Sequence, residues 1–203
     1  MTVIKEKPLF EKIIEAIVMD DEKQLNILIT QSKNIISCGE YEYSQALQTA
    51  SYYGHIECIK LIIPLSDPKD NNSFPLRLAS QNGHIECVRL LIPVSDPKSN
   101  KSLALRIACE NGHAECAKLL TPVSDPKTKN SYALQLAAEY NYKDCVELLL
   151  PHSDISKWCE KEWKNIDSGM QNIIQSYFLK LSLIQNIAAI GDKTLKIRKP
   201  HKI

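Results

Sequence analysis

The most restrictive feature of this 203-residue sequence is a unit of 29 residues that occurs four times in succession. Four residue types keep the spacing: Ser44, Ser73, Ser102 and Ser131; Leu47, Leu76, Leu105 and Leu134; Cys58, Cys87, Cys116 and Cys145; Pro64, Pro93, Pro122 and Pro151. A unit this short cannot bury its apolar side alone, but neighbours stacked in register share one continuous core. The period therefore predicts a solenoid.

Each unit has the pattern of two short helices separated by a break, as the third copy shows. Ser102 is a residue type that caps helix starts, and apolar residues recur at helical spacing over 103–110. Gly112 supplies the positive φ that ends a helix, a second apolar face follows over 116–120, and Pro122 ends that helix. The Ser-Asp-Pro-Lys that comes next is typical of a turn.

These residues resemble the ankyrin repeat. "NGHIECVRLL" (82–91) is similar to the second-helix motif of that family, with Cys in place of its core Ile, and "SFPLRLASQNGH" (73–84) is similar to its first-helix motif. The resemblance covers about residues 9–166 and implies an all-α, ankyrin-type helix-turn-helix solenoid. The ankyrin period is about 33 residues, and the residues missing here fall between Pro122 and Ser131 and in the equivalent segments. The family forms a projecting β-hairpin there, so we expect tight turns with little or no β-structure.

The flanks follow the same plan without the Gly-His-x-Glu-Cys motif, as expected of terminal units that have one face in water. We divide the chain into a diverged N-terminal capping repeat (1–43), four ankyrin-like repeats (44–159), C-terminal capping helices (160–191) and a basic flexible tail (192–203). The segment 170–190 is apolar on more than one face, which is more than a cap needs. We expect it to wrap the last repeat; the alternative is that it joins two otherwise monomeric chains in a weak homodimer.

Three of the units contain His-x-x-Cys, a pair of metal-ligand types, beginning at His55, His84 and His113. A closed zinc site needs four ligands within about 2.3 Å of the ion, whereas packed helices hold the next pair about 10 Å away. In the fourth unit Tyr142 replaces the His, while Cys145 is kept. Because Cys behaves as a small buried hydrophobe, we expect core cysteines, His side chains that hydrogen-bond between repeats, and no metal.

The composition limits the classes of function. With 25 Lys and Arg against 24 Asp and Glu, the whole chain has no electrostatic affinity for nucleic acid or an acidic membrane. The tail 192–203 is the exception, and a nucleic-acid-binding or nuclear adaptor is therefore the alternative function. The sequence has no phosphate-binding loop, metalloprotease motif or nucleophile elbow, and the residues after Cys159 are too few for a catalytic domain. We expect no catalysis, no cofactor and no small-molecule substrate.

The cysteines also indicate the compartment, because residues that recur at one packed position do not form a disulfide framework. The N-terminus lacks the pattern of a signal peptide, and no apolar stretch has the length of a membrane span. We therefore expect a cytoplasmic protein without a membrane partner, or one acting in host cytoplasm or nucleus if it is a host-directed effector or a viral protein.

The repeats differ from one another mainly in the first helix, while the second helix and the turn scarcely change. In ankyrin proteins the first helices line the concave face that grips partner proteins, so the resemblance implies a protein–protein interaction module. The positions on that face are Gln48, Tyr52, Tyr53, Arg77, Gln81, Arg106, Glu110, Gln135, Glu139 and Tyr140. Tyr and Arg dominate interface hot spots, and Arg77 and Arg106 suit a carboxylate or phosphate on the partner. The alternative is that both arginines pair with carboxylates of neighbouring repeats, such as Glu110.

Overall fold

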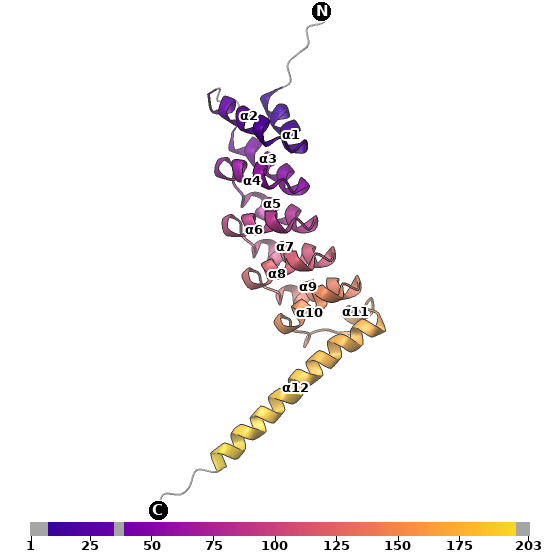
Figure 1. Ribbon diagram of the computed structural model, residues 1–203. Coiled ribbons are helices and arrows are strands. Elements are labelled where there is room, and N and C mark those ends of the chain that lie inside the picture. Colours follow the sequence, from indigo (N-terminus) through magenta and orange to yellow (C-terminus); the bar gives the residue numbers. More distant parts are fainter. Residues whose placement is uncertain (1–7, 35–38, 198–203) are drawn as a thin grey trace, which may run out of the picture.

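A computed structural model describes residues 8–34 and 39–197, and for residues 32–34, 186 and 188–197 it describes the backbone alone. The helices stack in pairs along one axis, with the first helices on one side and the second helices on the other (Figure 1). Across the described ranges every regular element is helical, and no strand occurs. The predicted all-α helix-turn-helix solenoid is therefore the observed fold.

The first helices of the pairs are α1 (Leu9–Val18), α3 (Glu40–Tyr53), α5 (Asp70–Gln81), α7 (Ser99–Glu110) and α9 (Thr128–Glu139). The second helices are α2 (Glu22–Asn34), α4 (Ile56–Ile62), α6 (Ile85–Leu91), α8 (Ala114–Leu120) and α10 (Lys143–Leu149). In the four repeats each second helix runs into a 3-10 turn that holds the periodic proline: η1 (Ile63–Leu65), η2 (Ile92–Val94), η3 (Thr121–Val123) and η4 (Leu150–His152). The chain then continues as α11 (Glu160–Trp163) and α12 (Ser168–Ile197).

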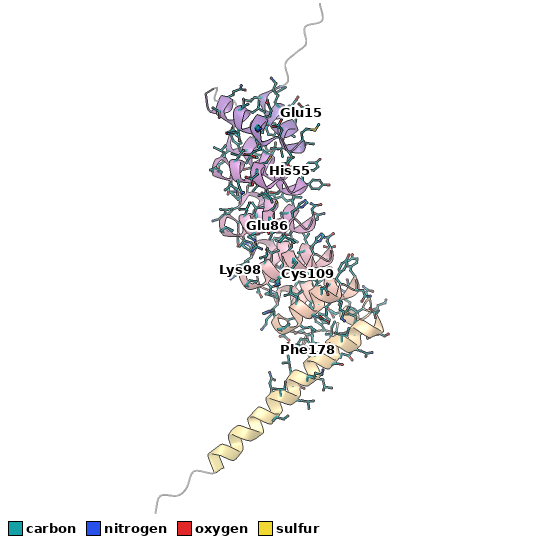
Figure 2. The ribbon with its side chains drawn as sticks, viewed as in Figure 1. Glu15, His55, Glu86, Lys98, Cys109 and Phe178 are labelled. Atoms are coloured by element: carbon teal, nitrogen blue, oxygen red, sulfur yellow. The ribbon has the colours of Figure 1, made fainter. Side chains whose placement is uncertain are left out.

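One core runs through the whole stack, and side chains fill the space between successive pairs (Figure 2). The periodic leucines and cysteines form its centre and are fully buried: Leu47, Leu76, Leu105 and Leu134; Cys58, Cys87, Cys116 and Cys145. Burial raises the pKa of the Cys87 and Cys116 thiols to about 11, so both are neutral at pH 7. The prediction of core cysteines is confirmed.

Neighbouring repeats are joined by histidine at the break between the two helices. The Nε2 atom of His113 lies 3.0 Å from the carbonyl oxygen of Gln81, at the end of the preceding first helix. His84 makes the equivalent contact with Tyr52, at 2.9 Å. The imidazole of His113 approaches the preceding repeat beside Gly83, whose φ of +73° is the left-handed value predicted for a helix end. The predicted hydrogen bonds between repeats are confirmed at these two histidines.

The turn between repeats is a short left-handed helical segment rather than a β-hairpin. Three consecutive residues have φ between +46° and +59° at the start of each of α5, α7 and α9, namely 71–73, 100–102 and 129–131. This region costs an L-residue about 1–2 kcal/mol and is most accessible to Asn, which occupies four of the nine positions. The expected tight turn is therefore present, and it needs hydrogen bonds to hold it.

Ser102 is not the helix cap that its position predicts. It is the third residue of the left-handed turn, and its Oγ accepts a hydrogen bond, 2.8 Å long, from the backbone N–H of Asp125 at the far end of the same repeat. The same bond closes the other repeats, from Asp67 to Ser44, Asp96 to Ser73 and Asp154 to Ser131. The Asp125 carboxylate in turn accepts from the N–H of Lys127. The serine recurs because it closes each repeat.

α12 is 30 residues long, but only its first turns cap the stack. Met170 and Ile174 are buried, and Phe178 is the last side chain of the helix that packs against the core. Beyond this point the helix projects away from the repeats (Figures 1 and 2). The wrapping of the last repeat is thus less extensive than expected. The helix continues through Ile197, past the predicted start of the flexible tail, and residues 198–203 lie outside the described residues.

Candidate partner-binding surface

The outward face of the first helices forms one continuous surface along the stack (Figure 1). Residues three and four apart share a helix face, and equivalent positions of successive repeats lie side by side. All ten predicted site residues lie on α3, α5, α7 and α9 or directly after α9. The structure gives them different surroundings, and only some of them are available to a partner.

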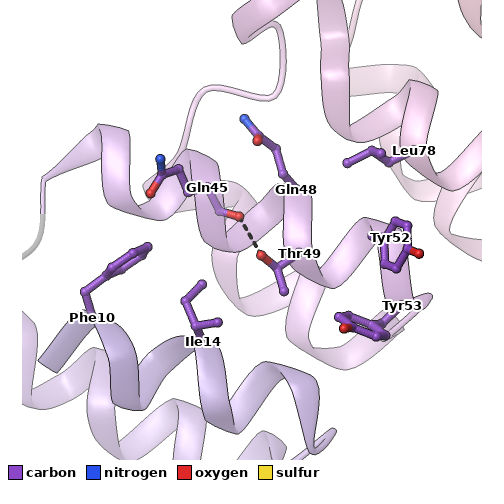
Figure 3. Close-up of a pocket in the computed structure, with 8 residues that line it drawn as sticks. All are labelled: Phe10, Ile14, Gln45, Gln48, Thr49, Tyr52, Tyr53 and Leu78. Carbon is purple, nitrogen blue, oxygen red and sulfur yellow. Dashed lines mark hydrogen bonds between the residues drawn. The ribbon is translucent and has the colours of Figure 1, made fainter. Parts of the chain in front are cut away.

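The N-terminal end of this surface holds a hollow of about 490 Å³ between α1, α3 and α5 (Figure 3). Its lining residues are Phe10, Ile14, Gln45, Gln48, Thr49, Tyr52, Tyr53 and Leu78. Tyr52 and Tyr53 are 49% and 47% exposed, and their rings meet edge to face with 5.1 Å between centroids. The structure therefore brings together three predicted residues, Gln48, Tyr52 and Tyr53, in one concave site.

The two predicted arginines serve the turns of their own repeats. Arg106 is only 7% exposed, and its Nε and Nη2 donate to the carbonyl oxygens of Lys101 and Asn100 at 3.1 and 3.0 Å. Arg77 Nη1 donates to the carbonyl oxygen of Asn71 at 3.1 Å. Burial lowers the pKa of both guanidinium groups. Their hydrogen bonds go to carbonyl groups of the left-handed turn rather than to the carboxylates of neighbouring repeats.

The C-terminal segment covers the part of the surface that belongs to the fourth repeat. Gln135 Nε2 donates to Glu139 Oε1 at 2.9 Å, and the Nδ2 of Asn165, beyond α11, lies 3.5 Å from the same oxygen. The indole N–H of Trp158 donates to the carbonyl oxygen of Asn130 at 2.6 Å. The predicted residues Gln135 and Glu139 are therefore already engaged within the chain.

The other three predicted residues are exposed near the C-terminal ends of the first helices. Gln81 and Glu110 end α5 and α7, and Tyr140 follows α9 and is 53% exposed. None of them lines the hollow. They continue the same surface toward the C-terminus, where they flank the concave site rather than form part of it.

The sequence reasoning missed the apolar side chains that wall the hollow, Phe10, Ile14 and Leu78. A signal for Leu78 exists, because the residue after Arg77, and its equivalents Ile107 and Leu136, is apolar in three of the four repeats. For α1 the signal is an apolar surplus in Leu9–Val18, since more of its side chains are apolar than one buried stripe requires.

The His-x-x-Cys pairs do not converge. Within the ranges that the structure describes, no three His, Cys, Asp or Glu residues lie close enough together to hold a metal ion. The cysteines lie in the core, whereas His84 and His113 contact carbonyl groups of the preceding repeat. His55, which follows the N-terminal unit, has its Nδ1 3.2 Å from Asp20 Oδ1. The Sγ of Cys58 lies 3.9 Å from the same oxygen. His84 and His113 are thus used between repeats apart from their cysteines, whereas His55 and Cys58 share one contact with Asp20.

The comparisons with known proteins agree with this architecture. A family model for ankyrin repeats (3 copies) matches residues 13–101 and 94–160. A comparison with curated proteins finds no match. In the part of the chain for which the structure gives helices, none has the length and apolarity to cross a membrane. Ankyrin repeats are in general protein–protein interaction modules. The 29-residue period, the stacked helix pairs and the family match over most of the sequence show that this chain belongs to the ankyrin repeat family.

Proposed function

We propose that this chain is a non-catalytic module that binds a partner protein through its first-helix surface, centred on the hollow at the N-terminal end. The observation that carries the proposal is that this hollow is lined by three residues selected for binding from the sequence, Gln48, Tyr52 and Tyr53. The far end of the same surface is covered by the chain's own segment around Trp158 and Asn165. The N-terminal end therefore keeps its predicted residues open to a partner, in a hollow of about 490 Å³.

The chemistry of the hollow favours a particular kind of partner segment. Phe10, Ile14 and Leu78 provide apolar walls for one aliphatic or aromatic side chain. The amides of Gln45 and Gln48 carry both donors and acceptors, which suits the backbone of an extended peptide. Residues 8–54 contain seven acidic and three basic residues. The partner segment that fits best is a peptide with an apolar anchor flanked by Lys or Arg.

The arginines have a smaller role in this proposal than their positions along the sequence predict. Arg106 is buried and hydrogen-bonded to the turn, so replacing it would destabilise the fold and would not report on binding alone. A test of the surface should use exposed residues instead. Tyr52 and Tyr140 form a matched pair, because both are tyrosines about half exposed on the same side of the stack and only Tyr52 lines the hollow.

The experiment is a selection of binding peptides from a random displayed library against the full chain, followed by affinity measurements on Tyr52→Ser and Tyr140→Ser. We expect selected peptides to share an apolar anchor with flanking basic residues. Tyr52→Ser should weaken their binding at least about tenfold, and Tyr140→Ser should leave it unchanged, with both variants melting as the parent does. Equal losses in the two variants, or none in Tyr52→Ser, would place the binding site outside the hollow.

The alternative, nucleic-acid binding through the tail, rests on residues 192–203, whose side chains lie outside the described part of the chain. Nucleic-acid binding through the tail would show an affinity for nucleic acid that falls steeply with salt and is lost when these residues are removed. The peptide-binding proposal predicts that neither removal of the tail nor moderate salt abolishes binding at the hollow.

A further inference from the structure

The projecting part of α12 exposes apolar side chains that no described residue covers. Leu179, Leu183, Ile184 and Ile187 are 63%, 53%, 62% and 69% exposed. Between Ile173 and Gly191 the only charged residue is Lys180. Most helical stability in proteins comes from packing an apolar face, and a helix without ion pairs that is apolar on several sides is marginal in water. A stable helix here therefore requires that another surface bury these apolar side chains.

A groove lies beside the same helix, where it leaves the stack. Its volume is about 450 Å³. It is lined by Glu147 and Leu150 of the fourth repeat and by Asn172, Ile173, Ser176, Tyr177 and Lys180 of α12. The exposed apolar side chains begin at the end of this groove and continue along the helix. The uncovered surface thus has two parts, a groove at the base and a stripe beyond it.

We propose that a second copy of this chain covers the groove and the part of the stripe formed by Ile184 and Ile187, with its α12 packed antiparallel against the first. Tyr177, Lys180, Ile184, Ile187 and Gly191 are spaced by three and four residues, the pattern of a helix-pairing seam. In the two-fold register centred between Ile184 and Ile187, each Ile184 lies opposite the Ile187 of the other copy. Such a pair is self-complementary and closed, because each copy contributes the same surface.

The register explains features on both sides of its centre. It places Lys180 opposite Gly191 of the other copy, so that the longest side chain of the seam meets the position without one. It also brings the last turn of the other α12, which contains Lys193 and Lys196, beside the groove that holds Glu147. The sequence of that turn has a net positive charge, and Glu147, which pairs with Lys143 at 3.6 Å, is the acidic residue of the groove. A parallel pair would place Lys180 against Lys180 and leave both grooves unfilled.

The size of the contact sets its strength. The part of α12 after Phe178 extends for about 28 Å at 1.5 Å per residue, which is a narrow strip compared with the roughly 800 Å² that each partner contributes to a standard interface. The groove adds to this area at each end. We therefore expect a reversible dimer with a dissociation constant on the order of micromolar.

The first test is sedimentation velocity of the full chain between about 1 and 200 μM, concentrations that bracket this constant. The parent should shift from monomer to dimer, and Ile184→Asp with Ile187→Asp should weaken dimerisation by at least about 30-fold. Ser182→Asp is the matched control, because Ser182 is exposed on the same helix outside the seam. Unchanged circular dichroism would show that the repeats stay folded. A parent that stays monomeric throughout, or an Ile184→Asp, Ile187→Asp variant that dimerises like the parent, overturns the proposal.

The second test reads the register. In a Cys38→Ser, Cys159→Ser background, the pair Lys180→Cys and Gly191→Cys in one chain should form a disulfide-linked dimer under mild oxidation, whereas either cysteine alone should not. Efficient linkage through Lys180→Cys alone would mean a parallel pair and would overturn the register. Flotation with phosphatidylserine-containing vesicles tests whether a lipid surface buries the stripe instead. Co-flotation of a chain that is monomeric in solution would assign the stripe to lipid and overturn the dimer.

Discussion

The imidazole of His113 occupies the space that a side chain on Gly83 would need, with its Nδ1 2.6 Å from the position of a Cβ at that glycine. The same relationship joins Gly54 to His84. At Asn141, the fourth-repeat equivalent, the backbone has the same left-handed conformation, with φ of +61°, but a side chain is present. Gly54 and Gly83 therefore leave room for the ring of the next repeat. Asn suffices where the array ends, and Asp20 suffices at the N-terminal break, where His55 contacts its carboxylate instead.

Replacing Gly83 with Ala should destabilise the protein by about 2–4 kcal/mol, because it adds the cost of a left-handed L-residue to the displacement of His113 and its hydrogen bond. Urea unfolding measures the change. In a His113→Ala background the same substitution should cost less, since no ring remains to be displaced. Asn141→Gly is the control and should change stability by less than about 0.5 kcal/mol. Equal costs of Gly83→Ala in the two backgrounds would contradict the steric argument.

Replacing Arg106 with Met should cost about 2–3 kcal/mol, because it keeps the bulk of the side chain but leaves the carbonyl groups of Asn100 and Lys101 without their donor. Thermal or urea unfolding checks this. Arg89→Met is the comparison, since Arg89 is exposed and pairs with Glu86 on the surface, and it should cost at most about 0.5 kcal/mol. If the two variants are equally stable, the guanidinium of Arg106 does not hold the turn.

The buried thiols predict a loss of stability in alkaline solution. The pKa of Cys87 and of Cys116 is raised from 9.0 to about 11 by burial, so in the unfolded chain these thiols ionise at lower pH than in the folded protein. Between about pH 9 and 11 the unfolded state binds fewer protons, and the free energy of unfolding therefore falls as pH rises. Replacing both residues with Ala should make this fall shallower, by up to about 2.7 kcal/mol per pH unit.

The measurement for this prediction is urea unfolding at several pH values from 8 to about 10.5, the range over which unfolded thiols ionise. Cys159→Ala is the control, because Cys159 is exposed, and it should leave the pH dependence unchanged. The same slope in the parent and in the double Ala variant would mean that other groups cause the alkaline loss.

The fold could be predicted from the sequence because three features recur in every repeat and each acts locally. The period sets the repeat length, the break separates the two helices, and the proline ends the second helix. The turn could be predicted as short but not as left-handed. Its residues, such as Asn71 and Asn72, tolerate positive φ without requiring it, and the conformation depends on hydrogen bonds from Arg77 and Arg106 that lie several residues away. Ser102 was misassigned for the same reason, since its partner, Asp125, is distant in sequence.

The candidate site could be predicted only in part. Position in the repeat identifies the outward face of the first helices, and this places Gln48, Tyr52 and Tyr53 correctly on the surface that forms the hollow. The pattern within one repeat cannot show what the rest of the chain does to that face. The engagement of Arg106 by the turn and the covering of Glu139 by Asn165 arise from tertiary contacts outside the repeat pattern.

The closing bond from Asp125 to Ser102 spans 23 residues, and the joining contact from His113 to Gln81 spans 32 residues. Both recur with the 29-residue period. An in-frame gain of 29 codons that copies the third repeat would therefore recreate the closing and joining bonds at the new boundary, because the copy carries Ser102, Gly112 and His113. The gene encoding this protein can lengthen its first-helix surface by unequal recombination within the middle repeats in a single event, without any compensating substitution.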